Sequence, residues 1–425
     1  MSILSNPISS ILLDIGGTFI KSAVIEFGQA HPENIQLFET PSFTPSESEY
    51  RKIPTEALLK SIEQAIEAQR RYKPQVSRIY TSGQMGGYVL QSNQGFEIVS
   101  WQDTRSTLPM NNNFRVELDK WIAVSDSFKD TGSEIRPGLP FYALALLKSQ
   151  DSMKLPLQPF RSIISFVTSY LTDFQSVDMH VTDAAASGLF SLKENNWSKE
   201  LTSMTGDFLM YPNVHMAVKK IGVSSKFNLD VFAGVGDQQA SLLGAGLQPG
   251  NIVVNIGTGG QVAGLHEDVA KSGKFQIRPY FFGQNIRTIT HLPSGRALKA
   301  FVEHCFDGSL SSEHFEAFER FGKSFPDAPE IDLVDYETSL RKITENGLEK
   351  NGELISSMFF QSLIQVYSRS LEQLHLPGDL LFAGGVGQKV RLISEELSRT
   401  TGRNFRISDR NETTLEGLGI LANVH

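Results

Sequence analysis

The chain of 425 residues contains a single cysteine, Cys305. One cysteine excludes an internal disulfide and any zinc site built from several cysteines. The sequence also lacks an apolar run approaching the ~20 residues of a membrane-spanning helix. Its first residues carry no positive charge, and the apolar run at 11–13 is too short for a secretory signal. We therefore expect a cytoplasmic protein with no membrane partner.

Basic residues are scarcer than acidic ones, with 39 Lys and Arg against 47 Asp and Glu and a net charge of -8. Proteins that bind nucleic acid usually present a basic face, so we expect no nucleic-acid partner. A chain of this length exceeds the size at which one hydrophobic core keeps growing. We predict two domains, with a boundary at the Gln248-Pro249-Gly250 turn that divides the chain into 1–247 and 248–425.

A glycine hairpin near the amino terminus is the first motif with chemical content. An apolar strand ends on Asp14, and the turn Gly16-Gly17-Thr18 leads into a second strand that includes Lys21. A buried carboxylate is costly without a partner, and glycine N–H groups can approach an anion closely. A carboxylate beside a glycine turn suggests a site for a phosphate that is bound to a metal ion. Taken alone, the motif also fits a simple turn between two strands.

The second half of the chain repeats this pattern. Residues 253–265 can be aligned with residues 12–24, so that Asn255 takes the place of Asp14. The helix expected at 55–72 and its strand at 76–80 likewise correspond to a helix at 358–374 and a strand at 380–382. Two similar halves predict a duplicated α/β domain with a cleft between the copies. Chance similarity between two generic glycine turns is the alternative.

Phosphoryl transfer needs backbone N–H groups around the phosphates, a carboxylate for the metal and a base at the acceptor hydroxyl. The turn Gly257-Thr258-Gly259 could face the first hairpin, while Asp14 holds Mg²⁺ together with several waters. Asp237 follows a glycine at an expected helix start, where the helix N-terminus should keep its carboxylate ionised at a low pKa. Judged locally, a helix-capping role for Asp237 is favoured over a catalytic one.

Six motifs taken together resemble the FGGY-type carbohydrate kinases, a family that includes xylulokinase and glycerol kinase. In chain order they are Asp14-Ile-Gly-Gly-Thr18 with Lys21, Ser82-Gly-Gln-Met-Gly86, Trp101-Gln-Asp-Thr-Arg105, Gly236-Asp-Gln-Gln-Ala240, Gly257-Thr-Gly259 and Ala383-Gly-Gly385. The resemblance implies two actin-like ATPase (ribonuclease H-like) domains with an interdomain cleft. It also implies that the first domain binds sugar and the second mainly ATP.

The resemblance assigns roles residue by residue. It makes Asp237 the catalytic base, reversing the local preference for a cap, and Asp14 the Mg²⁺ ligand. The implied ATP-binding residues are Gly16, Gly17, Thr18, Lys21, Gly257, Thr258, Gly259, Gly384 and Gly385. The implied sugar-binding residues are Gln84, Met85, Trp101, Asp103, Asp237 and Gln238. On local grounds, Trp101 and Met85 could equally be packing residues.

The chain departs from the family pattern at the acceptor motif. Ketopentose kinases often carry Met-His where this sequence has Met85-Gly86, and glycerol kinase carries Arg-Glu there. We expect ATP-dependent phosphorylation of a hydroxyl of a small sugar, with a ketopentose such as xylulose or ribulose as the leading acceptor. Two alternatives stay open: an actin-like sensor or scaffold with weak ATPase activity, and a kinase for a deoxy sugar, heptulose or polyol. The expected partners are ATP and a small sugar, and a homodimer is also open.

Overall fold

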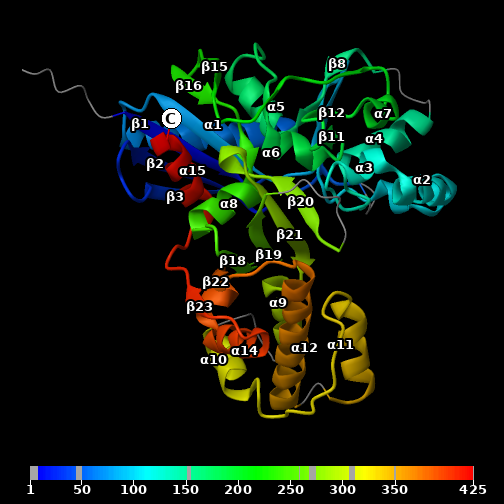
Figure 1. Ribbon diagram of the computed structural model, residues 1–425. Helices are drawn as coiled ribbons and strands as arrows, with labels where there is room; N and C mark the ends of the chain where they lie inside the picture. Colours follow the sequence, from blue (N-terminus) through cyan, green and yellow to red (C-terminus); the bar gives the residue numbers. More distant parts are fainter. Residues whose placement is uncertain are drawn as a thin grey trace, which may run out of the picture.

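Two lobes, each built around a mixed β-sheet, are stacked along the long axis of the molecule (Figure 1). The computed structural model describes residues 8–44, 50–150, 155–257, 259–267, 274–305, 312–348 and 351–424. Within these ranges no helix is both long and apolar enough to cross a membrane.

The sheet of the first lobe has the strand order β15-β16-β5-β1-β2-β3, and β17 pairs with β5. Its strands are β1 (Ser9–Ile15), β2 (Phe19–Glu26), β3 (Glu33–Glu39), β5 (Arg78–Gly83), β15 (Lys220–Ser224), β16 (Leu229–Phe232) and β17 (Val235–Gly236). Helices α1 (Thr55–Tyr72) and α5 (Ile163–Leu171) contribute to one hydrophobic core with β1, β2 and β5. Helix α1 has the bounds that the apolar spacing of the sequence predicts.

The sheet of the second lobe has the order β20-β21-β19-β18-β22-β23. Its strands are β18 (Asn251–Ile256), β19 (Gly260–His266), β20 (Gln276–Pro279), β21 (Asn285–Leu292), β22 (Asp379–Ala383) and β23 (Phe405–Ile407). The long helix α12 (Gly352–Gln373) packs against β19, β21 and α14 (Arg391–Thr401). Its start lies six residues before the one predicted from the sequence.

The strand pairing of the two lobes is the same. In the first lobe β1 runs antiparallel to β2 and parallel to β5, and β2 runs antiparallel to β3. In the second, β18 runs antiparallel to β19 and parallel to β22, and β19 runs antiparallel to β21. Asp14 lies opposite Lys21 in the first hairpin, and Asn255 lies opposite Gln261 in the second. The predicted fold class, a duplicated actin-like α/β protein, is confirmed.

A smaller sheet and further helices surround the two main sheets. The first lobe carries a small sheet of β4 (Lys52–Ile53), β6 (Tyr88–Ser92), β7 (Gly95–Val99) and β9 (Arg161–Ser162). Its further helices are α2 (Asn112–Val124), α3 (Asp126–Lys129), α4 (Pro140–Ser149), α6 (Val181–Ala184) and α7 (Lys199–Ser203). The second lobe adds α9 (Gly295–Cys305), α10 (Ser312–Phe321), α11 (Tyr336–Glu345) and α13 (Gly385–Lys389).

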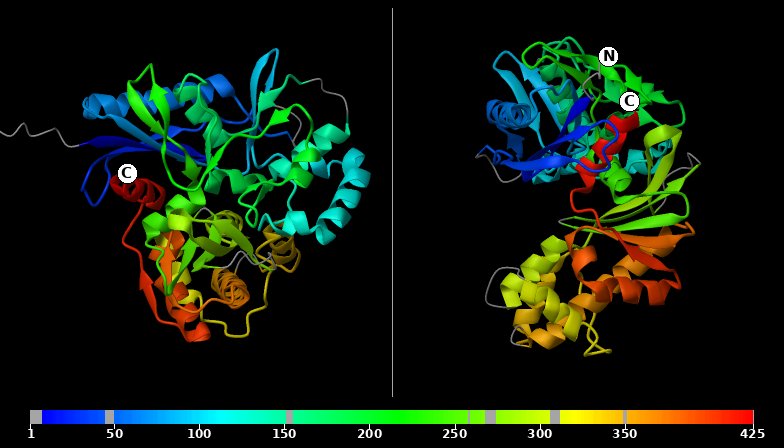
Figure 2. Two further views of the ribbon diagram at one scale, coloured as in Figure 1. Left: turned by 45° about the horizontal axis from the view of Figure 1, so that its top comes forward. Right: turned by 90° about the vertical axis from the view of Figure 1, so that its left-hand side faces the viewer.

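The C-terminal helix α15 (Thr413–Val424) returns to the first lobe, where Figures 1 and 2 show it beside β1 and β2. It packs mainly on α8 (Asp237–Ala245), and both helices join a core that also holds Val253 of β18. Helix α15 therefore packs against the first sheet, although it follows the strands of the second sheet in the chain. The division at residue 247 stays a prediction.

The crossing of α8 and α15 depends on two glycines. A Cβ on Gly244 would lie 1.8 Å from the carbonyl oxygen of Thr413, and one on Gly417 would lie 1.9 Å from that of Ala240. These neighbours are backbone atoms, so only a shift of one helix could relieve the overlap.

We expect Gly244→Ala to lower the free energy of unfolding by about 1–3 kcal/mol or more, because overpacking against backbone cannot be relieved by a rotamer change. Thermal or denaturant unfolding of the variant beside the parent chain measures this. An unchanged unfolding midpoint would contradict the close packing of the two helices.

Candidate active site

A cavity of ≈ 470 Å³ lies between the lobes and is lined by both glycine hairpins and the start of α8. It brings together many of the site residues predicted from the sequence. These are Asp14, Gly16, Gln84, Met85, Trp101, Asp237, Gln238, Gly257 and Gly259. Residues more than 200 positions apart in the chain therefore face one cleft, as the duplicated fold predicts.

The two hairpin turns are held by backbone hydrogen bonds. The Gly16 N–H donates to the Phe19 carbonyl (3.1 Å), and the Gly257 N–H donates to the Gly259 carbonyl (3.1 Å). Gly384, at the end of β22, has a φ of +80° and lies against the second turn. A Cβ on Gly384 would lie 2.5 Å from Asn255 Oδ1, so only glycine fits here without a backbone shift.

Several predicted ATP-binding residues lie outside the lining of this cavity: Gly17, Thr18, Lys21, Gly384 and Gly385. The Lys21 Nζ forms an ion pair with Glu412 at 2.5 Å, just before α15. Thr258 lies outside the described residues. The ATP-binding roles of all these residues stay predictions.

Asp14 is a buried carboxylate at the end of β1, with 6% of its surface exposed. Its Oδ1 has no hydrogen-bond partner. Burial raises the pKa of Asp14 to about 7, and the nearby Asp237 adds to the shift. An orphaned buried carboxylate fits a cation, and Mg²⁺ is commonly held by one or two carboxylates with waters and phosphates. No cluster of three or more metal-ligating side chains occurs among the described residues, so any cation here would rely on such additional ligands.

Asp237 is the first residue of α8, and Gly236 occupies the N-cap position. The capping role considered from the sequence is therefore wrong. Its Oδ1 accepts a hydrogen bond from the Gln238 N–H (2.8 Å). Burial raises the pKa of Asp237 to about 6, although the Gln238 N–H and Arg278 act in the opposite direction. The sequence predicts a low pKa for Asp237 from its place at a helix start. This prediction is wrong, because the loss of water around the buried carboxylate outweighs the effect of the local N–H groups.

Gln84, Met85 and Gln238 line the cleft together with Asp237. A Cβ on Gly236 would lie 2.5 Å from Met85 Sδ, so the thioether packs directly beside the start of α8. The Gln238 Nε2 donates to Gln261 Oε1 (2.8 Å) and Thr288 Oγ1 (3.0 Å), which leaves Gln238 Oε1 without a partner. Gln84 Nε2 also lacks one. Buried amide groups left unpaired favour a polar ligand in the cleft.

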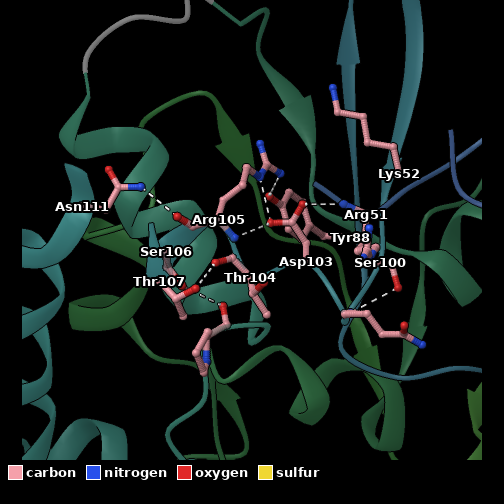
Figure 3. A network of polar contacts seen from close by, with 12 residues as sticks. Arg51, Lys52, Tyr88, Ser100, Asp103, Thr104, Arg105, Ser106, Thr107 and Asn111 are labelled. Atoms are coloured by element: carbon pink, nitrogen blue, oxygen red, sulfur yellow. Dashed lines mark hydrogen bonds and ion pairs between the residues drawn. The ribbon is translucent and has the colours of Figure 1, made fainter. Parts of the chain in front are cut away.

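Asp103 does not line the cavity. Its carboxylate accepts hydrogen bonds from the side chain of Arg105 (Nε, 2.8 Å) and from the backbone N–H groups of Arg105 and Arg51 (Figure 3). These bonds fix the loop that follows β7 and carries Trp101. The sugar-binding role of Asp103 stays a prediction, and its contacts fit a residue that positions this loop.

Sequence reasoning missed the basic side chains of the cleft. Arg136, Arg278, His291 and Arg296 all line the cavity. Burial lowers the pKa of His291 to about 4, and the positive charges of the three arginines contribute. Each lies in a segment without a distinctive sequence pattern, and only the fold brings them together. Asp183 lies on α6 and does not cap that helix. His180 caps α6, and the Asp183 carboxylate accepts a hydrogen bond from Ser162 Oγ (2.6 Å).

The fold and the cleft define a two-lobed, actin-like protein with glycine hairpins and two acidic side chains at the interface of the lobes. Residues 9–244 match the N-terminal domain of the FGGY family of carbohydrate kinases. The chain belongs to this family.

A xylulose kinase of Staphylococcus xylosus is 23% identical over 274 residues, which is 60% of this chain and 52% of that protein. The match thus spans about half of the relative's length. The fold is similar to that of a xylulose kinase from Rhodospirillum rubrum (TM-score 0.81, 14% identity, 98% of this chain and 89% of that one). It is also similar to that of a gluconate kinase from Lactobacillus acidophilus (TM-score 0.79, 13% identity, 97% and 89%). At these identities the structures show the fold alone.

Proposed function

We propose that this protein is a cytoplasmic kinase that transfers a phosphoryl group from ATP to a hydroxyl of a small sugar. The observation that carries the proposal is the meeting of Asp14, Asp237 and both glycine hairpins in one cleft. A ketopentose such as xylulose or ribulose is the acceptor expected from the resemblance to xylulose kinases. It is therefore the compound with which other acceptors are compared.

Asp237 would act as the base in this reaction. It would accept the proton of the sugar hydroxyl as that oxygen attacks the γ-phosphorus and the bond to the leaving ADP breaks. The unpaired Gln84 Nε2 and Gln238 Oε1 offer a donor and an acceptor to the sugar hydroxyls. The hairpins would orient the phosphates through their N–H groups. Mg²⁺, when bound at Asp14, would neutralise charge on the phosphates.

Both lobes line the cleft. Closure of the lobes on the bound substrates would exclude water, which otherwise competes with the sugar hydroxyl for the phosphoryl group. The test is acceptor-dependent release of ADP, measured over a panel of ketoses, aldoses, polyols and sugar acids. Release that depends on one class of acceptor supports the proposal. Equal release with and without every acceptor would contradict it.

The pH dependence of the reaction follows from the pKa of Asp237. The carboxylate must be ionised to accept a proton, and its pKa is raised to about 6. We therefore expect kcat/KM to fall about tenfold per pH unit below about pH 6 and to level off above it. A pH profile at saturating ATP and Mg²⁺ measures this. Full activity well below pH 6 would contradict the assignment of the base.

A further inference from the structure

Two arginines from different lobes meet in the cleft beside Asp237. Arg136 lies in the loop between α3 and α4, and Arg278 lies on β20. The backbone joins these segments, because the Ile277 N–H donates to the Gly132 carbonyl (3.0 Å). A side-chain bond from Gln276 Nε2 to Glu134 Oε2 (2.7 Å) reinforces the junction. The fold therefore holds both guanidinium groups at one place.

Both guanidinium groups are oriented by neutral partners. Arg136 Nη1 lies 2.5 Å from His291 Nε2, and Arg278 Nε donates to Gln276 Oε1 (2.9 Å). His291 is uncharged near neutral pH, because burial and the surrounding arginines lower its pKa to about 4. Within the described ranges, neither arginine forms an ion pair with a carboxylate. The carboxylates that act on both at longer range are Asp237 and the exposed Glu134.

Holding these two guanidinium groups close together carries an electrostatic cost. Burial lowers the pKa of Arg278 to about 10, and the positive charge of Arg136 contributes. Two like charges that are partly removed from water repel each other unless an anion lies between them. A guanidinium group presents a planar fork of N–H donors that matches a carboxylate.

The surroundings of Gly86 place Arg136 at the acceptor end of the cleft. Its φ is +83°, and a Cβ there would lie 3.1 Å from Arg136 Nη2 and 3.3 Å from Trp101 Cβ. Arg136 thus fills the space beside Met85 and Trp101, at the position where ketopentose kinases often carry a histidine. The positive charge therefore faces the predicted sugar site.

We propose that the acceptor is a small sugar acid, whose carboxylate is bound by Arg136 and Arg278 while one of its hydroxyls faces Asp237. This inference rests on the proposed kinase function and names the class of its acceptor. The hydroxyl oxygen forms the new bond to the γ-phosphorus, the bond to ADP breaks, and the proton goes to Asp237. The carboxylate of the acceptor is unchanged.

The test compares kcat/KM at saturating ATP for gluconate and xylonate with that for D-xylulose, D-ribulose and ribulose 5-phosphate. The sugar acids should be preferred. Arg278→Gln and Arg136→Gln should each lower kcat/KM for the acid by about 10- to 100-fold, because a charge-assisted hydrogen bond is lost. The KM for ATP should not change. Arg391→Gln is the matched control, since Arg391 is exposed on α14 and pairs with Glu395.

Calorimetry of the acid with the Asp237→Asn protein, without ATP, separates binding from catalysis. We expect the acid to bind there and to lose affinity when Arg278→Gln is added. Preference for a neutral ketose, with unchanged turnover in the arginine variants, would overturn the inference and leave the kinase function standing. Preference for ribulose 5-phosphate would overturn the assignment of a carboxylate as the group that the two arginines bind. Binding of the acid without phosphorylation of any acceptor would instead overturn the proposed function.

Discussion

Asp237→Asn is expected to lower kcat for the preferred acceptor by about 10²–10⁴-fold, the usual contribution of a positioned general base. The amide cannot take the proton of the sugar hydroxyl. It has nearly the same size as the carboxylate, and its oxygen can still accept the hydrogen bond from the Gln238 N–H. Folding and the KM values should therefore change little. Release of ADP in the presence of the acceptor, followed over a range of sugar concentrations, measures the effect.

Asp230→Asn is a suitable control for this substitution. Asp230 lies on β16, pairs with Lys220 at 2.6 Å and does not line the cleft. Its replacement should leave turnover within about twofold of the parent, because surface ion pairs contribute little. If Asp237→Asn retained the kcat of the parent, Asp237 would not be the base.

Asp14→Asn should lower turnover strongly and stabilise the metal-free protein at the same time. The carboxylate that we propose for Mg²⁺ would be lost, and with it about 3–4 kcal/mol of transition-state stabilisation, or 10²–10³-fold in kcat/KM. In the absence of metal, Asp14 Oδ1 has no hydrogen-bond partner, so the charge of the carboxylate is a cost to folding. We expect a gain of about 1–3 kcal/mol in the free energy of unfolding, because the asparagine amide avoids that charge but is also desolvated.

The stability gain should depend on pH. The pKa of Asp14 is raised in the folded state from its ordinary 3.8 to about 7. Below about pH 4 the carboxyl is protonated both folded and unfolded, so the substitution should have little effect. The gain should grow as the pH rises towards 7 and then level off. Denaturant unfolding in chelator at several pH values measures it.

Asp103→Asn provides the contrast for this stability prediction. Asp103 is buried to a similar extent as Asp14, but its oxygens accept hydrogen bonds from Arg105 and Arg51. Its replacement should therefore destabilise the protein. A loss of stability for Asp14→Asn in metal-free buffer would show that Asp14 has a structural partner in the fold.

The sequence predicts those parts of the molecule that depend on local pattern. The bounds of α1 follow from apolar side chains at helical spacing, and the two hairpins follow from their glycine turns. The internal repeat also predicts that Asp14 and the second turn face one cleft, because duplicated sheets place equivalent turns opposite each other.

What the sequence does not predict depends on distant contacts. The raised pKa of Asp237 comes from burial by both lobes, and the local helix start points the other way. Arg136 becomes part of the site only because β20 pairs with the loop at Gly132. The return of α15 to the first sheet likewise depends on glycines 173 positions apart, Gly244 and Gly417.

The most direct test of the proposed function is to follow both products of one reaction. With ATP, Mg²⁺ and the preferred acceptor, mass spectrometry should detect acceptor that carries one added phosphoryl group, in an amount equal to the ADP formed. Without acceptor, ADP should not accumulate. ADP accompanied by inorganic phosphate, with no phosphorylated acceptor from any member of the panel, would contradict the kinase and favour a nucleotide-binding module with weak ATPase activity.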